Sequence, residues 1–177
     1  MTQPRRQSGI VSLLTREDAY VSGPQVLSEL RRVTALSQTE LDELYVVRGA
    51  LEAAALEVAV RQSSPADHER AASIHEALDR AVAADDAAAF QRASREFHEA
   101  LLAPCRMPRL LHMLDIAWNL TEPVQTMMRT TEQDRVGMRA DHQQMLDAFV
   151  ARDAETLKAV AEAHHDRLTA CIARIGS

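Results

Sequence analysis

The sequence predicts an all-α protein, an antiparallel helical bundle of six to seven helices. Apolar residues recur at helical spacing along most of the chain, and cap residues separate these stretches. Hydrophobic residues, much of them alanine and leucine, make up 46% of the 177 residues, whereas aromatic residues account for 3% and glycine for five positions. This length suits one domain with its own core. We expect an irregular segment with a short helix over 1–35, then the bundle over 36–174.

Caps and prolines place the helix boundaries. The segment 37–40 is a capping-box pattern, Asp85 or Asp86 is placed to cap the helix that follows, and Pro104 and Pro108 bracket a turn. A tight turn is expected at 151–154, with Asp153 as the N-cap of the last helix. In chain order, helices are expected from Pro24 to Val33, from the capping box to about Arg61, from Pro65 to about Ala83, from Ala87 to Ala103, from Pro108 to about Thr130, and on either side of the 151–154 turn.

Two positions allow two interpretations each. Pro123 falls inside the expected 108–130 helix and leaves the carbonyl of Asn119 without its helical partner, which either lines a cavity or bends the helix around the core. Arg48 lies on an otherwise apolar helix, one turn from Glu52. An intrahelical ion pair and an anion-binding role explain Arg48 equally well.

Composition excludes several classes of partner. A net charge of −6 argues against direct nucleic-acid binding, because phosphate contacts need concentrated lysine and arginine. Cys105 and Cys171 show neither CxxC spacing nor a disulfide framework, which suits a reducing compartment. The sequence shows no signal peptide and no apolar run of membrane-spanning length. We therefore expect a cytoplasmic protein with no membrane partner.

Three histidines are placed to meet inside the bundle. His142 lies about ten residues before the 151–154 turn, and His164 lies about eleven residues after it. At about 1.5 Å of rise per residue, the two rings reach the same height on neighbouring antiparallel helices. His98, beside apolar residues in REFHEALL, comes from a third helix. The spacing therefore predicts a shared site in the core.

Imidazole is the commonest protein ligand of transition metals, and three imidazoles leave a coordination position open for water or a small molecule. Packing in the core is the alternative for each ring alone. His165 points about 100° away from His164 around its helix, so at most one of the two faces the core. The remaining candidates, His68, His75 and His112, lack matching partners and are interpreted as surface or boundary residues.

Three segments together resemble a known family. The runs ELYVVRGALEAAALEVAV, REFHEALL and DHQQMLDAFVARDAETLKAVAEAHH look like the FadR-type effector-binding and dimerisation (FCD) domain of regulators in the GntR superfamily. The resemblance covers about Leu36 to Ile172. Its most specific part is the histidine pair spaced by 22 residues around ARDAE, with FH on an earlier helix.

The resemblance implies a homodimeric sensor with a divalent metal at the floor of its effector pocket. The metal ligands would be His98, His142 and His164, and the effector would be a small organic acid whose carboxylate reaches the metal. Zinc or nickel are the first choices, with manganese or iron as alternatives. Arg48 and Asn119 are the expected effector contacts.

The sequence departs from the family at the fourth metal ligand. One turn before His98, where the family has an aspartate, it has Ser94. A serine hydroxyl is a poor ligand, so metal affinity should fall, or a water held by Ser94 takes the place. Three neutral imidazoles would leave the charge of a divalent ion uncompensated and strengthen its pull on an anion. Alternatively, the histidines bind an anion directly or simply pack.

A second departure concerns DNA. Regulators of this family begin with a winged helix-turn-helix, which needs roughly 60 to 70 residues, and residues 1–35 contain none. RRQSGIV resembles the end of the wing. A truncated product, a mis-called start and a natural stand-alone sensor are all compatible with this. In each case we expect no DNA binding by this chain alone.

Three functions compete. The first is a ligand-sensing regulatory domain that is not an enzyme. The second is a metal-dependent hydrolase, because an open three-histidine site can activate water. Against it, no carboxylate is clearly placed as a base, and Ser94 lacks a GxSxG context. The third is a metal-free structural or dimerisation domain, which Ser94 favours.

Overall fold

A computed structural model describes residues 36–121 and 130–176 of the chain. The chain divides into two compact units, Met1–Ser37 and Gln38–Ser177, and the described helices lie in the second. They are α3 (Gln38–Gln62), α4 (Pro65–Ala83), α5 (Ala87–Leu102), the short 3-10 helix η1 (Ala103–Cys105), α6 (Pro108–Thr121), α8 (Glu132–Ala151) and α9 (Ala154–Gly176).

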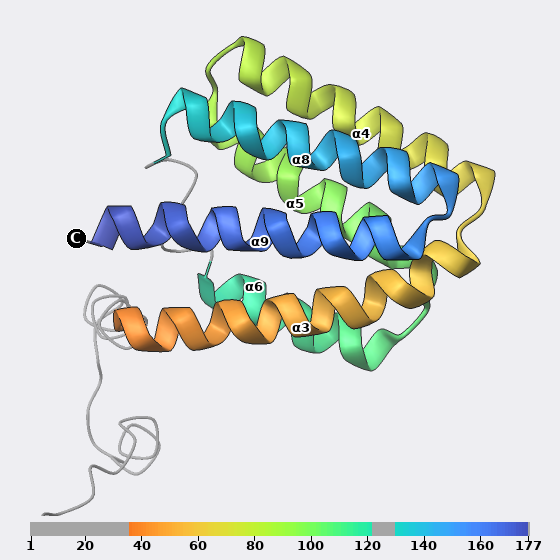
Figure 1. Ribbon diagram of the computed structural model, residues 1–177, viewed down its shortest axis with the longest axis horizontal. Helices are drawn as coiled ribbons and strands as arrows, with labels where there is room; N and C mark the ends of the chain where they lie inside the picture. The colour runs from red at the N-terminus through yellow and green to blue at the C-terminus, as the bar shows by residue number, and fades with distance from the viewer. Residues whose placement is uncertain (1–35, 122–129, 177) are drawn as a thin grey trace, which may run out of the picture. The chain divides into compact units, whose positions relative to one another are not determined.

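The described helices form a bundle (Figure 1). Helix α4 packs on α5 and α8, α9 packs on α8 and α3, and α6 packs on α3. Helix α4 runs antiparallel to α8, and α8 runs antiparallel to α9. The all-α prediction is confirmed. The expected 24–33 helix and the continuation around Pro123 toward Thr130 lie outside the described residues.

Side-chain caps fix the helix starts that position the site. Asp86, not Asp85, caps α5 by accepting a bond from the Ala89 amide (2.9 Å). At the junction of α8 and α9, Arg152 adopts a left-handed conformation (φ 57°) and ends α8. Asp153 then accepts a bond from the Thr156 amide (3.0 Å), as the predicted N-cap of α9. Short polar side chains at these positions satisfy amides that the first turn of a helix leaves unpaired.

The core contains polar as well as apolar side chains. Phe90 and Phe97 of α5 and Phe149 of α8 are fully buried, and so is His142. His75 is also buried, with 3% of its surface exposed, so its interpretation as a surface or boundary residue was wrong. Helix α4 is covered by both α5 and α8, which buries a wider face than a helix with one neighbour would bury.

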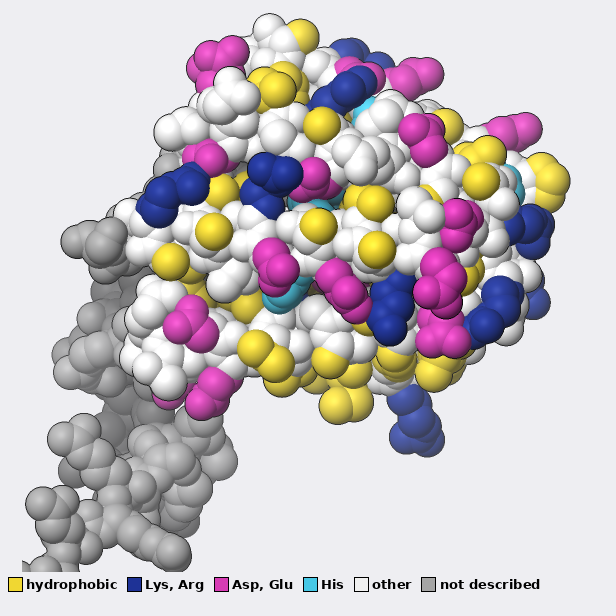
Figure 2. Space-filling model, in the orientation of Figure 1, with side chains coloured by type: hydrophobic (Ala, Val, Ile, Leu, Met, Phe, Trp, Pro, Cys, Tyr) yellow, Lys and Arg dark blue, Asp and Glu magenta, His cyan; other side chains and the backbone are white. Residues whose placement is uncertain are grey.

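The surface of the described bundle carries apolar side chains on α3 and α6. The most exposed side chains are Val46 on α3, Met113 and Ile116 on α6, and Val150 on α8, and Figure 2 shows hydrophobic side chains gathered along the α3 edge. No helix among the described residues is long and apolar enough to cross a membrane. Both cysteines are free thiols and buried.

Candidate metal centre and effector cavity

The structure brings together the three histidines that the sequence singles out. His98 comes from α5, His142 from α8 and His164 from α9, and each is at least 93% buried. One ring nitrogen from each lies within 4.8 Å of the others. The closest pair is His98 Nε2 and His142 Nε2, 3.2 Å apart. The tight 151–154 turn keeps α8 antiparallel to α9, so the two rings meet at one height, with centroids 4.5 Å apart.

Carboxylates face the outer nitrogens of two of these rings. Asp141 Oδ2 lies 3.3 Å from His164 Nδ1, and Arg167 Nε donates to the same oxygen at 2.8 Å. Glu52 Oε2 lies 3.7 Å from His98 Nδ1. A carboxylate at Nδ1 places the ring proton there and leaves the Nε2 lone pair for the centre of the cluster.

Burial keeps two of the three rings, His98 and His142, neutral. Desolvation lowers the pKa of His98 to about 4, with Glu52 opposing the shift. Desolvation also holds the pKa of His142 well below its usual value, helped by the neighbouring His164 and His98. Both rings are therefore unprotonated at neutral pH. Neutral imidazole is the form that binds a metal.

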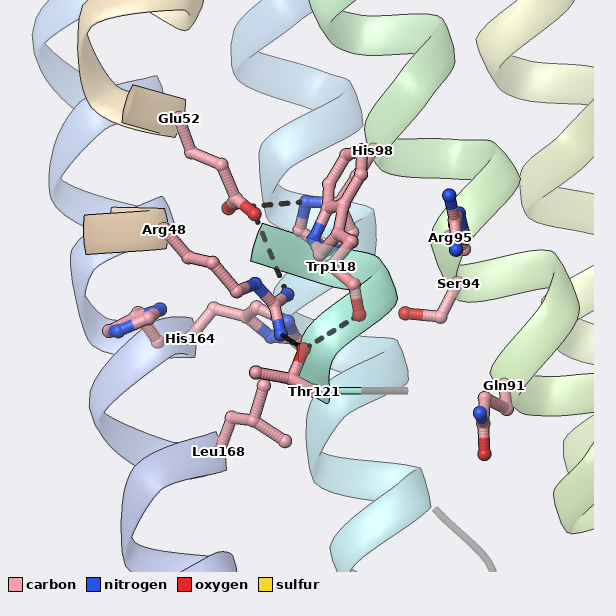
Figure 3. Close-up of a pocket in the computed structure, with 11 residues that line it drawn as sticks. Arg48, Glu52, Gln91, Ser94, Arg95, His98, Trp118, Thr121, His164 and Leu168 are labelled. Atoms are coloured by element: carbon pink, nitrogen blue, oxygen red, sulfur yellow. Dashed lines mark hydrogen bonds and ion pairs between the residues drawn. The ribbon is translucent and has the colours of Figure 1, made fainter. Parts of the chain in front are cut away.

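A cavity opens beside the cluster. Its volume is about 90 Å³, room for a few water-sized groups. The described residues that line it are Arg48, Glu52, Gln91, Ser94, Arg95, His98, Trp118, Thr121, His164, His165 and Leu168 (Figure 3). His165 is half-buried at the edge of the cavity while His164 is buried, in line with the expected 100° separation.

Arg48 forms the intrahelical ion pair with Glu52 and also lines the cavity. Its Nη2 lies 3.6 Å from Glu52 Oε1, one turn along α3, and its Nη1 donates to Thr121 Oγ1 on α6 (3.3 Å; Figure 3). The guanidinium also lies over the rings of Tyr45 and Trp118, at 4.9 and 5.8 Å from their centroids. These contacts hold a cation at the wall of the cavity.

Ser94 lies next to the cluster, and Asn119 lies apart from it. The Ser94 hydroxyl oxygen is 3.5 Å from His142 Nε2, so position 94 lies beside the cluster. Asn119 is exposed and outside the cavity lining, where its Oδ1 accepts a bond from Arg95 Nη1 (3.0 Å). Its link to the cavity is therefore indirect, through Arg95.

Comparison with known proteins places the chain. The family model of the FCD domain matches residues 43–167. The chain belongs to the FCD domain family. Among solved structures, Escherichia coli McbR/YncC superposes with a TM-score of 0.75 at 21% identity, over 80% of this chain and 68% of that one. A structure from work on Lar, which controls the expression of the Listeria monocytogenes agr system and mediates virulence, gives 0.70 at 13% identity, over 80% and 66%. No curated protein matches the sequence significantly.

These two likenesses support the fold of the FCD domain, which this chain shares over about two thirds of each solved structure's length. The donor set fits a divalent transition metal. Three buried imidazoles converge within 4.8 Å, and carboxylates face the outer nitrogens of two of them. Three nitrogen donors suit zinc and its neighbours among the transition metals.

Sequence reasoning missed three contributors to the site of this FCD domain. Glu52 was interpreted only as a partner of Arg48, although it also faces His98. Asp141 faces His164 on the next helix, and the only hint of its role in the sequence is that it directly precedes His142. Arg95 lines the cavity, but its spacing from Glu99 is that of an ordinary surface ion pair, and that pair does form (3.0 Å).

Proposed function

We propose that this FCD domain senses a small organic acid at a divalent transition metal held by His98, His142 and His164. The observation that carries the proposal is the convergence of three buried imidazoles at a cavity lined by two arginines. When bound, the metal would supply a Lewis-acidic site for the effector's carboxylate. Zinc or nickel are the first candidates, and manganese or iron are the alternatives.

The charges around the cavity favour an anion. Arg48 and Arg95 line it, and Glu52 is the one carboxylate among its described lining residues. Glu52 lies beside both Arg48 and His98, so its negative charge offsets part of the charge of Arg48. Ser94 is uncharged, whereas an aspartate at this position, as in the family, would add a negative charge. This favours binding of an acid over catalysis, and we propose a sensor that is not an enzyme.

The output of such a sensor is a change in equilibrium between two states with different affinities for the effector. As a GntR-type regulatory domain, it would act as a homodimer and pass this change to DNA-binding domains. We propose that this chain binds the effector and forms a dimer but does not bind operator DNA by itself. Sequence-specific DNA binding by the purified chain would contradict this.

Metal content tests the proposal first. The purified chain, stripped with a chelator, loaded with Zn²⁺ or Ni²⁺ and dialysed, should retain one metal per chain. His98→Ala should lose it, whereas His68→Ala should retain it, because His68 contacts Ser63 outside the cluster. Failure of the wild type to retain either metal would contradict the metal centre.

Effector binding is the second stage of the test. Calorimetric titration of the zinc-loaded chain with a panel of small mono-, di- and tricarboxylates should give saturable heat for at least one acid. The same acid should bind much more weakly to the chelator-treated chain. Equal affinity with and without zinc would show that the histidines bind the anion directly.

A further inference from the structure

His75 is the one buried histidine outside the cluster, among the described residues, that faces the same part of the core. It lies on α4 with 3% of its surface exposed. Its ring packs edge-on against Phe97, at 5.8 Å between centroids, and the centroid of the Phe97 ring also lies 5.1 Å from that of the His142 ring. Asp79 Oδ2, one turn further along α4, lies 3.8 Å from His75 Nδ1.

Two contacts at different points along the helices fix the register of α4 against α8. Asp79 accepts a bond from Arg139, and His68 packs edge-on against Phe149 with centroids 5.2 Å apart. The two helices run antiparallel (Figure 1). Moving four residues back from Asp79 reaches position 75, and moving three residues on from Arg139 reaches position 142. At about 1.5 Å of rise per residue, these two positions lie within one residue's rise of the same height.

The two rings present atoms that lack partners. His142 Nδ1 and His75 Nε2 are both buried, and neither has a hydrogen-bond partner among the residues that the structure describes. Buried polar atoms are almost always paired. His142 differs in this from His98 and His164, whose outer nitrogens face Glu52 and Asp141.

Their protonation patterns are complementary. Asp79 Oδ2 lies 3.8 Å from Nδ1 of His75, and with its proton on that nitrogen the His75 ring offers Nε2 as an acceptor. The Nε2 atom of His142 faces the cluster, so as a metal ligand this ring carries its proton on Nδ1. One ring thus offers a donor where the other offers an acceptor.

We propose that His142 Nδ1–H donates to His75 Nε2 through one buried water molecule, which makes His75 the positioning residue of this metal ligand. The inference rests on the metal centre proposed above. It completes a pattern in which every ligand has an outer partner: Glu52 for His98, Asp141 for His164, and His75 with Asp79 behind it for His142. Two of the outer partners are carboxylates and the third is an imidazole.

Zinc affinity tests this role. Zn²⁺ binding by the full chain is measured by competition with a chromophoric chelator in wild type, His75→Leu and His75→Gln. Loss of an outer partner weakens metal binding by about 10–100-fold, so His75→Leu should fall in this range. His75→Gln should stay near wild type, because its amide oxygen can accept the bond. The matched control, His68→Leu on the same helix, should bind zinc as wild type does.

A second measurement separates positioning from packing. In the zinc-loaded chain, the Nδ1 proton of His142 should be visible and slow to exchange by ¹H–¹⁵N NMR, and it should exchange rapidly in His75→Leu. If His75→Leu does not fold, His75→Phe replaces it, because phenylalanine keeps the ring but offers no acceptor.

The outcomes are distinguishable. Absence of zinc binding in wild type overturns the metal centre itself. Tight zinc binding in wild type with unchanged affinity in His75→Leu or His75→Phe overturns only the role of His75. Equal loss in the leucine and glutamine variants also overturns it, because an acceptor at this position would then make no difference.

Discussion

The floor and the wall of the cavity differ in charge and in burial. The floor is the cluster of His98, His142 and His164, each at least 93% buried. Of these rings, His98 and His142 carry no charge at neutral pH, because burial lowers their pKa values. The wall includes Arg48 and Arg95, held by ion pairs and aromatic faces at the edge of solvent. A neutral, enclosed floor suits a metal, and a charged, accessible wall suits recognition of an anion. The account therefore assigns metal affinity to the floor and effector affinity to the wall, and the two should be separable by substitution.

The largest effect is expected at the floor. His142→Ala removes a ligand, so zinc affinity should fall by more than the roughly 10–100-fold that loss of an outer partner costs. Competition with a chromophoric chelator measures it. His112→Ala, an exposed histidine on α6, is the control and should leave zinc affinity unchanged. Zinc binding by His142→Ala at wild-type affinity would place the metal elsewhere.

Restoring the family's carboxylate should strengthen the floor. Ser94→Asp places an anionic oxygen next to His142 Nε2, where the serine hydroxyl lies at 3.5 Å. Zinc affinity should rise by about tenfold or more, equivalent to about 1.4 kcal/mol. Acid effectors should bind this variant more weakly, because the metal's charge is partly compensated. Ser73→Asp, exposed on α4, is the control. No gain in zinc affinity would show that position 94 does not reach the metal.

A substitution at the wall should spare the metal. Arg48→Gln removes the cation that Glu52 and Thr121 hold at the cavity. Loss of one partner of a buried, hydrogen-bonded charge pair costs about 2–5 kcal/mol in binding, so affinity for an acid identified by calorimetry should fall at least tenfold. Zinc affinity should change little. Arg61→Gln, exposed on the same helix, should change neither quantity. A parallel loss of zinc and acid binding would erase the distinction between floor and wall.

The smallest effect is expected away from the cavity. Asp153→Ala removes the N-cap of α9 at the turn that aligns His142 with His164. The melting temperature, followed by circular dichroism, should fall by about 2–4 °C, while zinc affinity stays the same because the helices remain packed. Asp147→Ala, which leaves the caps intact, should melt within about a degree of wild type. A large loss of zinc affinity in Asp153→Ala would show that the cap, and not helix packing, sets the register of the site.

Spacing along the chain predicted the part of the site that depends on a single turn and the two helices it joins. The pair of His142 and His164 could be matched in height because a capped, tight turn at 151–154 links their helices directly. The cap of α9 could be predicted for the same reason, since a short polar side chain acts within four residues. The class of fold followed from periodicity over the whole chain.

What the sequence did not reveal depends on contacts between helices far apart in the chain. The burial of His75 results from the packing of α4 against both α5 and α8, and a single helical pattern does not say how many neighbours a helix has. Glu52 reaches His98 across 46 positions, and its ordinary partner, Arg48, lies one turn away. Local pairs of opposite charge therefore concealed residues that also line the site.

X-ray absorption at the zinc edge of the loaded chain tests the central claim most directly. The account predicts a first shell with three imidazole nitrogens at about 2.0–2.1 Å in the wild type, and one fewer imidazole in His142→Ala. A first shell with sulfur ligands, or with fewer than three imidazoles in the wild type, would contradict it.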